Sequence, residues 1–230
     1  MDEFYLAKWI DLTKTSHGDL ATGTTLIWEA LAALSKYVQQ HSAQRHIAAS
    51  AQIHPTALIA EHVVISENVK IGPYCVVDDY VIIGNAVTLG YGCYIRSNSI
   101  IENNCALGHA VEIKHAWLGA TVKLPHFNYI GDSILGSQVH LGGGALLANF
   151  KSDGSDIIVT AGQQRIPTGL RKFGAVLGDR AEIGAGAILN PGTLIGHDSI
   201  IYPGAIVRGV IPANKIYKVK SRDIEIVDRQ

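Results

Sequence analysis

The sequence lacks several features that would place it in a familiar class. No apolar run reaches the length of a transmembrane segment, and the acidic start MDEFYLAKW has no basic signal-peptide region. Lysine and arginine together number 19 against 20 aspartate and glutamate residues, which gives a net charge of -1. Nucleic-acid binders usually show a basic excess. We therefore expect a cytoplasmic protein with no membrane and no nucleic-acid partner.

Cysteine is also scarce, with three residues in the whole chain. Cys75, Cys93 and Cys105 occupy the same place in a repeated pattern, where neighbouring repeats carry valine or alanine. Small side chains in a buried column account for this placement better than a metal site or a nucleophile does. No disulfide framework is implied.

What the sequence contains in abundance is a six-residue repeat. An aliphatic residue returns at every sixth position from Ile53 to Ile113. The step shortens by one residue twice before Leu147, and the period resumes from Leu177 to Val207. A second position, four residues after each aliphatic one, holds mostly small or β-branched side chains. This hexapeptide pattern predicts an all-β fold, a parallel β-helix with three hexads in each triangular coil.

The repeat divides the chain into three predicted parts. Residues 1–50 are expected to form an N-terminal helical cap and connector. Residues 51–212 are expected to form the β-helix, and residues 213–230 a polar C-terminal tail.

An inserted loop is expected at about 151–174, where the six-residue phase is lost. Within it, Ile157 to Thr160 reads as a short β-like run. Excursions from a solenoid often build a binding site on one face, and a tolerated surface insertion is the alternative. Arg165, Arg171 and Lys172 would suit an anionic partner, although loop cations are more often only solvated.

An amphipathic helix is expected in the N-terminal part. Ile27, Leu31, Leu34 and Val38 follow one another at helical spacing, so the helix has one apolar stripe and ends near Gln40. Because solenoids need capped ends, we expect this helix to close an open end of the β-helix. Binding of a partner protein is the alternative.

Two cations are predicted to stack on one face. Assigning the hexads in order to three faces places Arg96 and Lys114 one coil apart. Two cations roughly 5 Å apart repel by about 3 kcal/mol at an effective dielectric constant near 20, and long flexible stems relieve most of this. The pair is either two solvated side chains or a site for a doubly charged anion such as a phosphate monoester.

Two histidines and a tyrosine fall near the same face. His109 and His126 share a column in successive coils, and Tyr129 lies at the corner adjoining Arg96 and Lys114. A histidine beside an anion site suits a general base, because imidazole titrates near neutral pH. Stacked histidines could also hold zinc, but neither carboxylates nor cysteines offer a third ligand, so no metal is expected.

These residues belong to segments that resemble a known family. VEIKHAWLG (111–119), LPHFNYIGDSILG (124–136) and LGGGALLANF (141–150) are similar to the C-terminal acetyltransferase domain of the bifunctional glucosamine-1-phosphate acetyltransferase/N-acetylglucosamine-1-phosphate uridylyltransferase family. TGLRKFGAVLGD (168–179) is more similar to the archaeal sugar-1-phosphate nucleotidylyltransferase/acetyltransferase branch. The resemblance covers about residues 51–222.

The resemblance implies a left-handed parallel β-helix, a homotrimer and acetyl-CoA as the acyl donor. It also implies roles for the acceptor-site residues: Arg96 and Lys114 hold the sugar phosphate, and Tyr129 and Asn149 contact the amino sugar. For catalysis it implies that His126 is the general base, with Glu112 as an acidic neighbour, and that Gly143 offers its N–H to the thioester carbonyl. For the donor it implies an acetyl-CoA groove between subunits, lined by Ala185, Pro203 and Lys220.

The sequence departs from the family at several points. His140 takes a substrate-binding position where the bacterial enzymes have asparagine, and Phe150 replaces their tyrosine. Ser155 and Ile158 stand where the archaeal branch has lysines. Residues 1–50 are too few for the nucleotide-binding pyrophosphorylase domain, so uridylyl transfer is not expected.

The sequence thus predicts an acetyl-CoA-dependent N-acetyltransferase that acts on a hexosamine 1-phosphate of the glucosamine- or galactosamine-1-phosphate type. Two alternatives stay open at this point. One is a non-catalytic, regulatory β-helix that binds sugar nucleotides. The other is a zinc-dependent carbonic anhydrase on the same fold.

Overall fold

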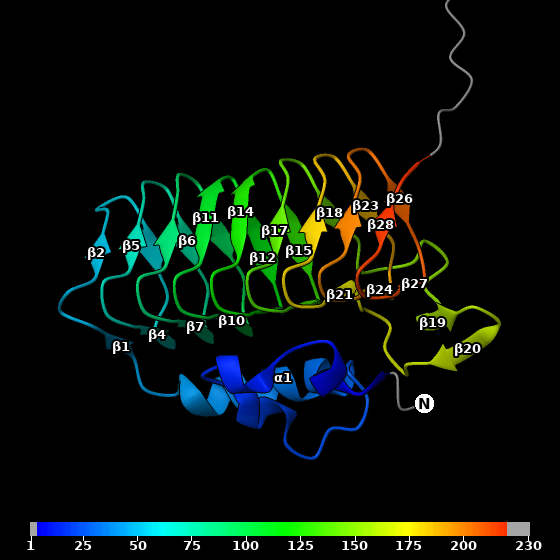
Figure 1. Ribbon diagram of the computed structural model, residues 1–230. Helices are drawn as coiled ribbons and strands as arrows, with labels where there is room; N and C mark the ends of the chain where they lie inside the picture. Colours follow the sequence, from blue (N-terminus) through cyan, green and yellow to red (C-terminus); the bar gives the residue numbers. More distant parts are fainter. Residues whose placement is uncertain (1–3, 220–230) are drawn as a thin grey trace, which may run out of the picture.

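The computed structural model describes residues 4–219, which wind into a parallel β-helix with an N-terminal segment along one side (Figure 1). Three parallel sheets form the sides of the β-helix. Sheet A contains, in spatial order, β1 (His46–Ile47), β4 (Val63–Ile65), β7 (Val81–Ile83), β10 (Ser99–Ile101), β13 (Trp117–Leu118), β16 (Ile134–Leu135), β21 (Ala175–Leu177), β24 (Thr193–Ile195) and β27 (Val210–Ile211).

Sheet B contains β2 (Gln52–Ile53), β5 (Lys70–Ile71), β8 (Thr88–Leu89), β11 (Ala106–His109), β14 (Lys123–His126), β17 (His140–Leu141), β22 (Glu182–Ile183), β25 (Ile200–Ile201) and β28 (Ile216–Tyr217). Sheet C contains β3 (Leu58–Ile59), β6 (Val76–Val77), β9 (Tyr94–Ile95), β12 (Glu112–Lys114), β15 (Tyr129–Gly131), β18 (Leu146–Leu147), β23 (Ile188–Leu189) and β26 (Ile206–Val207). The β-helix therefore extends slightly beyond the expected 51–212 at both ends.

The register of the strands follows the six-residue period. Ile53 pairs with Ile71 eighteen residues later, which is three hexads. Leu107 pairs with Leu124, seventeen residues later, because the shortened step lies between them. The periodic aliphatic side chains point inward and form one continuous buried core. The predicted parallel β-helix is confirmed, and it is consistent with the left-handed form that the resemblance implies.

The N-terminal segment consists of three short 3-10 helices and one α-helix: η2 (Leu6–Lys8), η3 (Leu12–Lys14), η4 (Gly18–Ala21) and α1 (Glu29–His41). The predicted helix is present and carries the expected buried stripe. It begins at Glu29, because the Glu29 carboxylate accepts hydrogen bonds from the backbone N–H groups of Thr25 and Leu26 and fastens a preceding turn.

This segment does not close an open end of the β-helix, and that expectation is wrong. It covers the outer face of sheet A, against β7 and β10 (Figure 1). Six strands of sheet A each present an apolar side chain outward: Ile82, Ile100, Trp117, Ile134, Val176 and Leu194. These residues and the apolar residues of the N-terminal segment form a second buried cluster. Burial of this face favours docking along the side.

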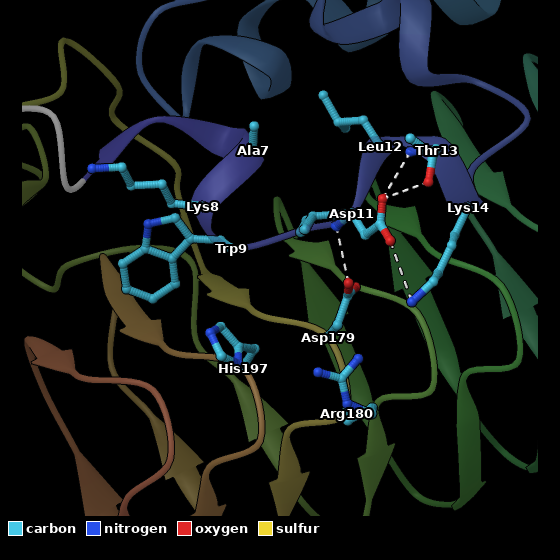
Figure 2. Close-up of a pocket in the computed structure, with 11 residues that line it drawn as sticks. Ala7, Lys8, Trp9, Asp11, Leu12, Thr13, Lys14, Asp179, Arg180 and His197 are labelled. Atoms are coloured by element: carbon cyan, nitrogen blue, oxygen red, sulfur yellow. Dashed lines mark hydrogen bonds and ion pairs between the residues drawn. The ribbon is translucent and has the colours of Figure 1, made fainter.

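The part of the N-terminal segment around Trp9 and Asp11 is held to the β-helix by hydrogen bonds with Asp179 (Figure 2). The N–H of Asp11 donates to the carboxylate of Asp179 at 2.9 Å, and the N–H of Asp179 donates to the carbonyl of Trp9 at 3.1 Å. A cavity of about 450 Å³ lies beside this junction, next to Arg180 and His197.

No helix in residues 4–219 is both long and apolar enough to cross a membrane.

The inserted segment forms an antiparallel hairpin, β19 (Ile158–Ala161) and β20 (Gln164–Pro167). The predicted β-like run is therefore confirmed. Ile157 and Val159 are fully buried in the outer cluster, so the hairpin is held against the coils.

Candidate functional site

The candidate residues lie on sheet C and on the two corners that border it. Glu112 of β12 pairs with Tyr94 of β9 on one side and with Tyr129 of β15 on the other. Arg96 and Lys114 occur where these strands run into the corner toward sheet A. His126 ends β14 on sheet B, at the opposite corner. The residues therefore do not meet at one corner, because His126 and the two cations lie at opposite ends of the short strands of sheet C.

Arg96 is paired with Glu112. The guanidinium Nη1 lies 2.9 Å from the carboxylate Oε1, and both side chains are partly exposed. The hydrogen bond that the guanidinium donates to Glu112 raises the pKa of Arg96 above its ordinary value. Glu112 is expected from the resemblance to be the acidic neighbour of His126. Among the residues that the structure describes, it makes its side-chain hydrogen bond with Arg96 instead.

Lys114 belongs to a cluster around a buried aspartate that the sequence did not single out. Its Nζ lies 2.8 and 3.1 Å from the two carboxylate oxygens of Asp132. Nδ1 of His115 lies 2.9 Å from the same carboxylate, and the Asn149 amide donates to it as well. The Asp132 side chain is only 6% exposed.

Burial alone would raise the pKa of the Asp132 carboxyl. Hydrogen bonds from His115 and Lys114 more than offset this effect and hold the pKa below its ordinary value. Asp132 is therefore a buried anion that orients three side chains at once. Asp132 is the last residue of the His-x-x-Tyr-x-Gly-Asp segment, and its place in that segment was the feature of the sequence that could have identified it.

Arg96 and Lys114 therefore do not form an unshielded pair of like charges, because each has its own carboxylate partner. They line a cavity of about 360 Å³ together with Tyr94 and His115. Ser35 from α1 lies on the wall of the same cavity, so the N-terminal segment borders the candidate site.

His126 lies against a glycine turn from the next coil. A Cβ added at Gly143 would lie 2.5 Å from the His126 Nε2 atom. The carbonyl of His126 accepts a hydrogen bond from the N–H of Gly144. The Gly143 N–H donates to no other residue within 4–219, which leaves it available beside the imidazole. Asn128 fixes the turn, because its buried amide donates to the Gly142 carbonyl at 2.8 Å.

The expected stacking of His109 on His126 is confirmed by their pairing between β11 and β14. Tyr129 lies between the two ends of the site, and its hydroxyl lies 3.3 Å from the Asn149 amide nitrogen. Burial raises the pKa of Tyr129. His140 is not part of this group, since it lies on sheet B and pairs with Glu182 at 2.8 Å.

The predicted donor groove follows the corner between sheets B and C. Ala185 and Pro203 follow Gly143 in successive coils: Gly186 donates to the Gly143 carbonyl, and Gly204 donates to the Ala185 carbonyl. Lys220 lies outside the described residues. Within residues 4–219, no group of three or more His, Cys, Asp and Glu side chains could hold a metal ion.

Comparisons with known proteins agree with the resemblance. The family model "Bacterial transferase hexapeptide (six repeats)" matches residues 174–209. The bifunctional sugar-1-phosphate nucleotidylyltransferase/acetyltransferase of Sulfurisphaera tokodaii is 36% identical over 110 residues, covering 48% of this chain and 27% of that protein. The bifunctional protein GlmU of Methanococcus vannielii is 35% identical over 96 residues, covering 42% and 23%. The chain thus spans about a quarter of these relatives, consistent with a match to an acetyltransferase domain alone.

Solved structures show weaker similarity. A hexapeptide transferase family protein from Anaplasma phagocytophilum is 16% identical, with 72% of each chain covered and a TM-score of 0.34. The acetyltransferase domain of PglB from Neisseria gonorrhoeae FA1090, in complex with acetyl coenzyme A, is also 16% identical. It covers 74% of this chain and 52% of that chain, with a TM-score of 0.22.

Proposed function

We propose that the protein is an acetyl-CoA-dependent N-acetyltransferase whose acceptor is a hexosamine 1-phosphate. The observation that carries this proposal is the contact between the His126 imidazole and the Gly143 turn, whose N–H is available. A base and an oxyanion donor side by side are what acyl transfer to an amine requires. The names of the curated relatives support the same class of reaction.

In the proposed reaction, Nε2 of His126 takes a proton from the acceptor ammonium. The free amine attacks the thioester carbonyl, and the N–H of Gly143 stabilises the oxyanion that forms. The tetrahedral intermediate collapses as the carbon–sulfur bond breaks. The nitrogen releases its second proton to solvent, and the proton held by His126 passes to the thiolate of coenzyme A, so the products are an acetamide, the free thiol and one proton.

The acceptor would lie across sheet C. Its amine would face His126 at one corner, and its phosphate would face Arg96 and Lys114 at the other. Tyr129 and Asn149 would contact the sugar between these ends. His140 lies on β17, where its imidazole pairs with Glu182, so we assign it no contact with the acceptor in this orientation.

The donor would follow the column of Gly143, Ala185 and Pro203. This column is open on the surface of a single chain. We propose that a second copy covers it in a homotrimer. Sedimentation of a monomer at micromolar concentration would contradict this arrangement.

A thiol-release assay tests the function. Acetyl-CoA is incubated with glucosamine 1-phosphate, galactosamine 1-phosphate and the corresponding 6-phosphates. We expect release of coenzyme A that depends on one of the 1-phosphates. Binding of the sugar phosphates without thiol release would instead favour a non-catalytic sugar-phosphate or sugar-nucleotide receptor.

A further inference from the structure

A second cavity lies at the same edge of sheet C, farther toward the C-terminal coils. Its volume is about 510 Å³, within the range of small-molecule sites. One wall comes from the β19–β20 hairpin and the other from the residues that follow β23 and β26. The proposed acetyl transfer uses none of these residues.

The hairpin is placed rigidly against the coils. Ile157 and Val159 point into the outer hydrophobic cluster, so side chains at alternate positions of β19 point the other way. Thr160 is one of these, and it pairs with Arg165 across the hairpin. The hairpin packs closely on the coils at Gly209. A Cβ added to this glycine would lie 2.9 Å from the Thr160 carbonyl oxygen, so a larger residue would not fit there.

Two arginines from distant parts of the chain face this cavity. Arg165 comes from β20, and Arg208 follows β26. Neither guanidinium group forms a hydrogen bond or an ion pair with any other residue that the structure describes. The two other charged residues of the cavity hydrogen-bond to neutral groups: Lys151 donates to the Asp156 carbonyl at 2.6 Å, and the Asp153 carboxylate accepts from Ser155. Two guanidinium groups are thus free to bind an anion.

An aromatic ring completes the cavity. Phe150 lines the same space, and its side chain is 46% exposed, so its ring is accessible to a ligand. Guanidinium groups bind phosphate oxygens in pairs, and an exposed aromatic ring offers a stacking surface for a base. Phe150 directly follows Asn149, so the cavity adjoins the candidate acceptor site.

We propose that this cavity binds the nucleoside diphosphate part of a ligand, with Arg165 and Arg208 on the phosphates and Phe150 against the base. Two sources share this chemistry: the adenosine diphosphate portion of coenzyme A and the nucleotide of a nucleotide-linked sugar. The site is distinct from the phosphate site at Lys114. Coenzyme A as its ligand rests on the proposed acetyl transfer, whereas binding of UDP does not.

Calorimetric titration of the full chain tests the proposal without turnover. The probes are UDP, coenzyme A and pyrophosphate, titrated into the wild type and into Arg165→Ala, Arg208→Ala and Arg171→Ala. Arg171 is exposed on the same insertion and does not line the cavity, so it controls for net charge. We expect Arg165→Ala and Arg208→Ala each to raise the Kd of one nucleotide at least tenfold, and Arg171→Ala to change it less than twofold.

The pattern across probes identifies the source and the geometry. Dependence on the arginines for UDP points to a nucleotide-linked acceptor, and dependence for coenzyme A points to the donor. Phe150→Leu should weaken the nucleotide but not pyrophosphate. Equal effects of Arg165→Ala and Arg171→Ala would overturn the proposal. So would an equal loss in Lys114→Ala, because the nucleotide would then occupy the first phosphate site.

Discussion

Nζ of Lys114 lies 2.8 Å from Oδ2 of Asp132, a carboxylate almost completely removed from solvent. This contact reverses one expectation from the sequence. Two stacked cations were expected to repel each other in the empty protein. In the structure, Lys114 instead forms an ion pair with the buried Asp132 carboxylate, and Arg96 forms one with the partly exposed Glu112.

Lys114→Ala should therefore lower the stability of the empty protein. The substitution removes one of three partners of a buried carboxylate, which costs about 1–3 kcal/mol of unfolding free energy. Arg96→Ala is the matched control, because its exposed ion pair contributes about 1 kcal/mol or less. Urea unfolding measures both. Identical unfolding curves for Lys114→Ala and the wild type would remove Asp132 from its central place in the site.

Asp132→Asn should change how stability depends on pH. Because the folded protein holds the pKa of Asp132 below its ordinary value of about 3.9, the charged carboxylate stabilises the fold above that pH. That contribution is lost as pH falls through the lower, folded value. The wild type should exceed the variant in stability at pH 6, and the difference should shrink below about pH 4. A difference that stays constant from pH 6 to pH 3 would contradict the expected titration.

His126→Ala should lower kcat by roughly 10²–10⁴ and leave both KM values nearly unchanged, as expected for loss of a general base. His109→Ala is the control, because it stacks in the same column and has no role in the proposed reaction. Steady-state kinetics with acetyl-CoA and the best hexosamine phosphate provides the measurement. Unchanged kcat in the His126 variant would show that another group takes the proton.

Gly143→Ala should abolish most activity with little loss of stability. The new methyl group would lie 2.5 Å from Nε2 of His126 and would push the exposed imidazole aside. Residue 143 is not among the glycines with positive φ, so alanine causes no backbone strain there. If the effect acts through the imidazole, the double variant with His126→Ala should be no slower than His126→Ala alone. Fully multiplicative losses would indicate a separate role for the glycine.

Thiol reagents should react slowly with the native protein. Burial raises the pKa of the Cys105 thiol to about 12, so little thiolate is present at neutral pH. Cys75 and Cys93 are buried as well, and their Sγ atoms lie near carbonyl oxygens of the adjacent coil. The hydrogen bond with Cys93 lowers the pKa of the Cys75 thiol to about 7, so slow labelling of Cys75 depends on its burial rather than on a lack of thiolate. Mass spectrometry after timed alkylation measures the labelling. Rapid labelling coupled to loss of activity would mean that the cysteine column is not packed as described.

The sequence predicted the β-helix well because one inward side chain in every six is a direct physical requirement of the coil. The short step between Ile113 and Leu118 even predicted the change of register from eighteen to seventeen residues. With the register known, the alignment of His109 with His126 followed.

The position of the N-terminal segment was missed, although its signal was present. In every third hexad, a second apolar residue precedes the periodic one, as Ile100 precedes Ile101 and Trp117 precedes Leu118. Such pairs mark a sheet with apolar side chains on both faces, which needs a cover. The helical stripe shows that α1 packs against something, but it cannot show against what.

The charge pairing of the site was missed for a different reason. Lys114 and Asp132 are 18 residues apart, and their contact depends on how side chains leave two successive corners. Counting hexads predicts where the backbone of each coil lies. The side-chain rotamers decide whether the Lys114 ammonium and the Arg96 guanidinium face each other or turn toward carboxylates. The role of Asp132 needed coordinates.

The attachment of Asp11 to Asp179 has a consequence for the order in which the molecule is made. The two residues are 168 positions apart, so the N-terminal segment leaves the ribosome long before its docking surface is complete. Phe4, Trp9 and Trp28 must wait in a nascent chain until the last coils of sheet A have formed. The aromatic residues of this segment are then buried only after the coils that carry Phe173 and Asp179 have been synthesised.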